Sequence, residues 1–169
     1  TASLMKMTDK SSTLPSVASS LHTAGYTSDF WYGGDVGFTN MNSYLYETGY
    51  KTVKGDTYFS AKDRSYSKWG VPDHVVIDSL TNNLLRRDSA EPWMTTLLTL
   101  SSHEPWEVPY DRLEDPKRNS MAYTDHCLGQ MVDRLKESSL WDNLLIVILS
   151  DHGIRINDQQ SNSSYQVAH

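Results

Sequence analysis

The chain has 169 residues, with 15 lysines and arginines against 21 aspartates and glutamates, which gives a formal net charge of −6. This length fits one domain, and five Trp, ten Tyr and three Phe indicate a packed core. The negative charge argues against a nucleic-acid partner, because nucleic acid is bound by neutralising its phosphates. The charge does not exclude phosphorylated or sulfated substrates, since a metal ion can reverse the local charge. The single cysteine, Cys127, excludes an internal disulfide and a multi-cysteine zinc site.

Helix and strand patterns alternate along the chain. The expected elements of the first half are a helix, an aromatic-rich strand, a second helix and a short strand, over residues 14–24, 26–32, 38–48 and 50–53. Residues 54–72 show no clear period, and a helix is expected to begin near Asp73. The second half then predicts an apolar strand, the longest helix and a second apolar strand, over residues 93–100, 119–138 and 143–150. The alternation is typical of a parallel sheet. The run over 93–100 favours a buried strand, and the continuous apolar run over 143–150 favours a strand buried on both faces.

The two ends of the sequence predict its domain organisation. We expect residues 1–169 to form a single partial domain, because the first residues resemble the middle of a protein and show no signal peptide. A mobile polar tail is expected over residues 157–169. The longest apolar run, at residues 144–149, is far shorter than the roughly 20 residues that a membrane-spanning helix needs.

The strongest functional signal directly follows the last expected strand. There, Asp151 and His152 stand side by side and are followed by Gly153. They offer a hard oxygen and an imidazole nitrogen, which are ligands for a divalent metal ion. The plainer alternative is a strand end with a tight turn and a surface histidine.

Two other expected strands also end in polar residues. His103 follows the strand over 93–100, where an imidazole can donate to a phosphate or sulfate oxygen. Gly34 and Asp35 follow the strand over 26–32, where glycine permits close backbone approach and the carboxylate can bond a substrate hydroxyl. A solvated loop histidine and a plain turn are the alternatives. Three expected strands thus end in polar residues that can meet a ligand. The carboxyl ends of parallel strands meet at one edge of the sheet, where ligands bind, so this coincidence favours a functional site there.

Six motifs occur in an order that resembles a known family. They are Tyr32-Gly-Gly-Asp35, Phe38-x-Asn-Met41, Trp69-Gly-Val71, Thr99-Leu-Ser-Ser-His-Glu-Pro-Trp106, Tyr123-x-Asp125 with Leu128-Gly129, and Ser150-Asp-His-Gly153. Together they resemble the sulfatase-like phosphoglycerol transferases, the family of lipoteichoic acid synthase within the alkaline phosphatase superfamily.

The resemblance implies a fold and a cellular setting. The expected fold class is α/β, a sandwich with a mostly parallel central sheet flanked by helices, here incomplete at both ends. Family members carry N-terminal membrane helices, which this sequence lacks, and an extracytoplasmic catalytic domain in the cell envelope or periplasm. Their site holds a divalent metal, with manganese expected first and magnesium, zinc or calcium as alternatives, and a threonine nucleophile.

The resemblance also implies roles for five residues. Asp151 and His152 match the family's metal-binding pair, and His103 matches the histidine that contacts the substrate head group. Gly34 and Asp35 lie where the family places further head-group contacts. The nucleophile and the other metal ligands come from a segment upstream in the family, so no catalytic residue is expected among these 169 residues.

The sequence therefore predicts a fragment of a metal-dependent phosphoglycerol transferase or hydrolase that acts on phosphorylated or sulfated head groups of cell-envelope lipids or glycans. The fragment alone is expected to be inactive, without a nucleic-acid partner, and linked to the membrane only through helices absent from it. The alternatives are a true sulfatase, which hydrolyses sulfuric esters, and a non-catalytic envelope binding domain with a degenerate site.

Overall fold

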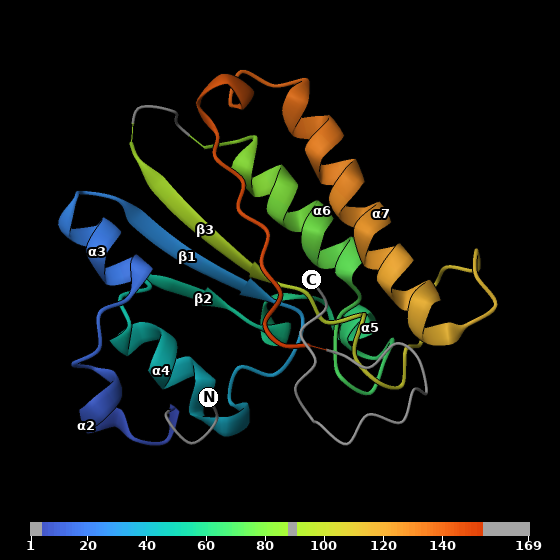
Figure 1. The fold of residues 1–169 in the computed structure, drawn as a ribbon, viewed down its shortest axis with the longest axis horizontal. Coiled ribbons are helices and arrows are strands. Elements are labelled where there is room, and N and C mark those ends of the chain that lie inside the picture. The colour runs from blue at the N-terminus through green and yellow to red at the C-terminus, as the bar shows by residue number, and fades with distance from the viewer. Residues whose placement is uncertain (1–4, 88–90, 154–169) are drawn as a thin grey trace.

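The computed structural model describes residues 5–87 and 91–153, and within them a parallel sheet has helices on both faces (Figure 1). The strands are β1 (Thr27–Tyr32), β2 (Thr52–Lys54) and β3 (Trp93–Leu98), in the order β2-β1-β3. Asp29 in β1 lies level with Thr52 in β2 and Thr95 in β3. The expected fold class, α/β with a mostly parallel sheet flanked by helices, is confirmed.

The helices follow the expected order, with shorter bounds at several ends. The α-helices are α2 (Thr8–Ser11), α3 (Val17–Thr23), α4 (Met41–Glu47), α5 (Ala61–Arg64), α6 (Asp73–Leu84) and α7 (Pro116–Lys136), and 3₁₀ turns lie at Phe38–Asn40, Asp56–Tyr58 and Trp141–Asn143. Local capping sets two starts. Ser16 forms a capping box with Ser19 at α3, and Asp115 accepts a hydrogen bond from the backbone N–H of Arg118 ahead of Pro116 at α7. None of the helices in the described part of the chain is long and apolar enough to cross a membrane.

Alternate residues of β1 face opposite helical layers, because side chains along a strand point to alternate faces. Ser28 faces one layer, where its hydroxyl donates to the backbone carbonyl of Gly49 at 3.0 Å. Phe30 packs edge-on against Tyr50 on the same face. Trp31 faces the other layer and is fully buried at 0% exposure. Its layer is the main core, which α6 and α7 complete with Val76, Ile77, Leu80, Leu84, Tyr123, Cys127, Met131 and Leu135.

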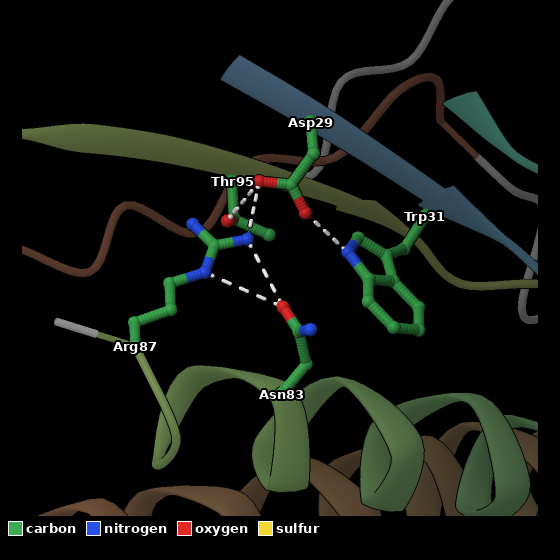
Figure 2. A network of polar contacts seen from close by, with 5 residues as sticks. All are labelled: Asp29, Trp31, Asn83, Arg87 and Thr95. Atoms are coloured by element: carbon green, nitrogen blue, oxygen red, sulfur yellow. Dashed lines mark hydrogen bonds and ion pairs between the residues drawn. The ribbon is translucent and has the colours of Figure 1, made fainter. Parts of the chain in front are cut away.

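A polar network joins the middle of the sheet to the end of α6 (Figure 2). Asp29 is 8% exposed, and its Oδ1 accepts hydrogen bonds from Arg87 Nη2 at 2.6 Å and Thr95 Oγ1 at 2.8 Å. The indole N–H of Trp31 donates to Oδ2 of the same carboxylate. Arg87 also donates to the Asn83 side-chain oxygen, at 3.1 Å from Nη2 and 3.3 Å from Nε. The network therefore fixes α6 to the sheet through a buried ion pair.

The strand expected over residues 143–150 is wrong for this structure. Residues 145–150 form no backbone hydrogen bond with another part of the described chain, and they belong to no strand. Leu144 and Ile146 pack against the core, whereas Leu145 and Leu149 are 85% and 84% exposed. An apolar run becomes a strand only when another strand satisfies its backbone groups, and here β3 does not pair with it.

For the same reason, β3 is less buried than the buried strand expected over residues 93–100. All six of its residues are half-buried, since it lies at the edge of the described sheet. The polar tail expected over residues 157–169 lies outside the described residues.

Candidate substrate and metal site

The winding of the sheet reverses between β1 and β3, and parallel sheets have their ligand-binding crevice at the carboxyl ends of such strands. The chain leaves β1 through α4 to reach β2 on one side, and it returns through α6 to β3 on the other side. Parallel sheets bind ligands where the direction of winding reverses in this way. The loops that follow β1 and β3 carry Gly34, Asp35 and His103, so the fold brings these predicted residues to one edge.

Glycines let the turn after β1 pack directly on the segment before α6. The carbonyl of Gly33 accepts a hydrogen bond from the backbone N–H of Val71 at 2.9 Å, and Gly34 forms a bridge with Gly70. Gly70 has φ +135°, and a Cβ there would lie 2.2 Å from the carbonyl oxygen of Gly33. Any larger residue would push the two segments apart. This contact brings Trp69 to the predicted substrate edge.

Trp69 and His103 form one wall of the crevice. Their ring centroids lie 4.7 Å apart, and both side chains are exposed. Nδ1 of His103 lies 2.8 Å from the backbone carbonyl of Glu104, which can only accept, so Nδ1 carries the proton. Nε2 is then left as the atom that meets a ligand. A hollow of about 10 Å³ beside the pair is lined by Leu100 and Ser101, and it has room for roughly one water molecule.

Asp35 is also exposed at this edge. Its Oδ1 accepts a hydrogen bond from the backbone N–H of Gly37 at 2.7 Å, which orients the carboxylate over the turn. Gly34 is buried, and its carbonyl accepts from the N–H of Asp56 at 3.0 Å. Gly34 thus shapes the backbone of the turn, and Asp35 is the group of this turn that can meet a hydroxyl.

Asp151 and His152 fit two positions on one cation. Nε2 of His152 lies 3.5 Å from Oδ2 of Asp151. Two ligands that are each about 2.0–2.2 Å from one ion lie about 3.0–3.5 Å apart. Nδ1 of His152 lies 3.1 Å from the Gly153 carbonyl, which can only accept, so Nδ1 carries a proton and Nε2 is the ring atom on the side of the carboxylate. A shared cation would stabilise that arrangement. No group of three or more His, Cys, Asp or Glu suited to a metal occurs among residues 5–87 and 91–153.

Tyr32, the last residue of β1, links the acidic groups of this edge. Burial raises the pKa of its phenol, and the negative charges of Asp35, Asp151 and Asp73 raise it further. Asp35 and Asp151 therefore act on one side chain, although they are far apart in the sequence.

Sequence reasoning assigned no role to Trp69, Tyr32 or Asp73. Trp69 was part of a recognised motif, so a signal was present. Tyr32 also opens a recognised motif, whereas the role of Asp73 depends on contacts between distant segments, which no local pattern reveals.

Comparisons with known proteins identify the family of the chain. A family model described as Sulfatase matches residues 2–168. Phosphoglycerol transferase I from Xanthomonas campestris pv. campestris (strain B100) is 30% identical over 152 residues, which cover 82% of this chain and 22% of that protein. Lipoteichoic acid synthase from Staphylococcus aureus (strain USA300) is 25% identical over 139 residues, which cover 76% of this chain and 21% of that protein.

The fold comparison points in the same direction. A crystal structure of a protein in the alkaline phosphatase superfamily from Vibrio parahaemolyticus matches with a TM-score of 0.68 and 28% identity, over 79% of this chain and 34% of that one. The chain spans about a fifth of the length of the curated relatives that it matches.

Proposed function

The chain belongs to the sulfatase family, and we propose that it supplies the substrate head-group site and part of the metal site of a phosphoglycerol transferase. The observation that carries this proposal is the His103–Trp69 pair at the carboxyl edge of the sheet, with the Nε2 of His103 left for a ligand. The names of two relatives, phosphoglycerol transferase I and lipoteichoic acid synthase, support the same chemistry.

The proposed ligand is a glycerol phosphate head group of an envelope lipid or glycan. His103 donates from Nε2, when protonated, to a non-bridging phosphate oxygen, and such a charge-assisted bond is about twice as strong as a neutral one. Asp35 accepts a hydrogen bond from a glycerol hydroxyl. These groups bind and orient the substrate, which is the main task of a protein in phosphoryl transfer.

Asp151 and His152 are proposed as ligands of a divalent cation, with manganese expected first and magnesium, zinc or calcium as alternatives. When bound, the ion would neutralise charge on the phosphoryl oxygens. Two ligands do not complete a coordination sphere. The remaining ligands and a threonine or serine nucleophile are therefore proposed to come from family residues beyond those that this chain spans, and the setting of the whole protein to be the extracytoplasmic envelope.

A binding experiment on the full 169-residue chain tests the head-group site. Glycerol phosphate is titrated while the ring protons of the histidines are followed by NMR, and His103 should shift in a saturable way. His103→Ala should abolish binding, and His22→Ala, an exposed histidine in α3, should leave it unchanged. Equal binding by the His103→Ala chain would contradict the assignment.

The family model itself favours a second candidate, a sulfuric ester hydrolase. The same titration with glycerol sulfate distinguishes the two. Tighter binding of the phosphate supports the phosphoglycerol transferase, whereas tighter binding of the sulfate supports the sulfatase. If neither ligand binds at His103, the degenerate-site alternative is favoured.

A further inference from the structure

Asp73, the first residue of α6, is a buried carboxylate without a cationic partner in the described part of the chain. It is 2% exposed. Its Oδ1 accepts a hydrogen bond from the backbone N–H of Leu100 at 2.8 Å. Its Oδ2 accepts from the backbone N–H of Ser101 at 3.2 Å and from the hydroxyl of Thr124 at 2.7 Å. Its own backbone N–H donates to the Ser101 hydroxyl at 2.9 Å, so the contact with the loop after β3 is reciprocal.

These bonds join three segments at Asp73: the start of α6, the loop after β3 and α7. Leu100 and Ser101 begin the loop after β3, and the carbonyl of Leu100 accepts the backbone N–H of His103 at 3.0 Å, which closes a turn. His103 is therefore one turn away from the carboxylate. Trp69 precedes Asp73 by four residues, and the backbone between them is fixed by the bond from Val71 to Gly33. The two rings of the candidate head-group site thus belong to segments that Asp73 ties together.

The chemistry of the position requires a group that only accepts hydrogen bonds. Burial raises the pKa of Asp73, and the hydrogen bonds from the loop and from α7 lower it in part. An asparagine would place an N–H₂ group against the backbone N–H of Ser101 or of Leu100, because its amide has only one oxygen. An apolar residue would fill the same space, but it would leave two backbone N–H groups and a buried hydroxyl without an acceptor. The position therefore needs a carboxylate, whose two oxygens hold the loop after β3 and α7 to the start of α6.

We propose that Asp73 is a positioning residue, which holds the loop of His103 against the segment of Trp69 and so sets the geometry of the head-group site. It touches neither the substrate nor the metal ligands. The identity of the ligand rests on the proposed function. The positioning of the Trp69 and His103 rings by Asp73 does not depend on it.

The experiment measures ring geometry directly on the full chain. Trp69 shifts the resonances of the His103 ring protons through its ring current, and the shift is obtained as the difference from the Trp69→Leu chain. Asp73→Asn should lose most of this shift and the nuclear Overhauser contacts between the two rings. Asp29→Asn, which alters another buried carboxylate of the same core, should retain both. Retention of the shift in Asp73→Asn would overturn the proposal.

A milder variant covers the case in which Asp73→Asn does not fold. Thr124→Val keeps the side-chain volume and removes one bond to Oδ2. It should reduce the ring-current shift while the Trp31 signals of the core stay unchanged. An unaltered shift in this variant would overturn the proposal.

Glycerol phosphate is titrated into the same samples, so that failure of the positioning proposal can be distinguished from failure of the proposed function. If Asp73→Asn loses the ring-current shift and the unmodified chain does not bind glycerol phosphate, the positioning role is supported and the proposed function is overturned. If Asp73→Asn keeps the shift and the unmodified chain binds glycerol phosphate, the positioning role alone is overturned.

Discussion

Replacing Arg87 by methionine should destabilise the chain through the buried carboxylate that it leaves behind. Arg87 and Asp29 form an ion pair at 2.6 Å, with side-chain exposures of 19% and 11% (Figure 2). Methionine keeps most of the apolar stem of the side chain and loses the guanidinium, which lies 4.8 Å from the ring centroid of Trp93. The substitution therefore removes mainly the charge, its hydrogen bonds and its contact with the Trp93 ring.

The expected loss of stability follows from what remains around Asp29. Removing one partner of a fully buried ion pair costs about 3–5 kcal/mol. Here the carboxylate keeps its bonds from Thr95 and Trp31, and Arg87 is partly solvated, which lowers the loss to about 2–3 kcal/mol. For a chain of 169 residues, each kcal/mol corresponds to about 2–4 °C in Tm. The expected fall in Tm is therefore about 4–12 °C.

The structure offers a matched control in a second arginine–aspartate pair, between α7 and α6. Arg134 pairs with Asp78 of α6 at 2.5 Å and also donates to Asn82, but the paired side chains are 39% and 62% exposed. Arg134→Met should change the free energy of unfolding by less than about 0.5 kcal/mol. Adding Asp29→Asn to Arg87→Met should recover part of the loss, because a neutral amide is cheaper to bury.

Thermal and urea unfolding, followed by circular dichroism, measure all four chains. Equal losses of unfolding free energy in Arg87→Met and Arg134→Met would contradict the prediction, because burial would then not change what an ion pair contributes to stability. A double variant less stable than Arg87→Met alone would refute it as well.

Three further predictions rest on burial and ligand count. Cys127 is 2% exposed, and burial raises its pKa to about 11, so at pH 8 only about one thiol in a thousand is the reactive thiolate. Mass spectrometry should therefore show slow alkylation of the native chain, and fast alkylation would contradict the burial of this side chain. Leu135→Ala should cost about 2–5 kcal/mol in urea unfolding, whereas Leu145→Ala, at a site 85% exposed, should cost less than about 0.5 kcal/mol. Calorimetry should show Mn²⁺ binding far weaker than micromolar, because Asp151 and His152 are only two ligands; a tight stoichiometric site would argue that the chain holds a complete metal centre.

Local patterns in the sequence predicted the elements that depend on local forces. The helical spacing of apolar residues anticipated α6 and α7, and the aromatic run before Gly33 anticipated β1, because periodicity and turn residues act within one segment. The strand-end rule then placed Gly34, Asp35 and His103 at one edge. That rule needs only the order and direction of the strands.

Local patterns could not predict the contacts between segments that are distant in the sequence. The apolar run at residues 144–149 predicted a buried strand, but whether it pairs depends on another strand at its side. Asp73 looked like a helix start, and its bonds to Leu100 and Thr124 become visible only when α6, α7 and the loop after β3 are packed together. The sequence therefore identified groups that can meet a ligand and missed the buried group that holds them.

The central claim is that the head-group site and the Asp–His pair form one site. Paramagnetic broadening by substoichiometric Mn²⁺, observed by NMR on the full chain, tests it most directly. The account predicts strong broadening of Asp151 and His152, weaker broadening of Tyr32 and His103, and loss of both effects in His152→Ala. Broadening that persists in His152→Ala, or that reaches neither Tyr32 nor His103, would contradict a single site.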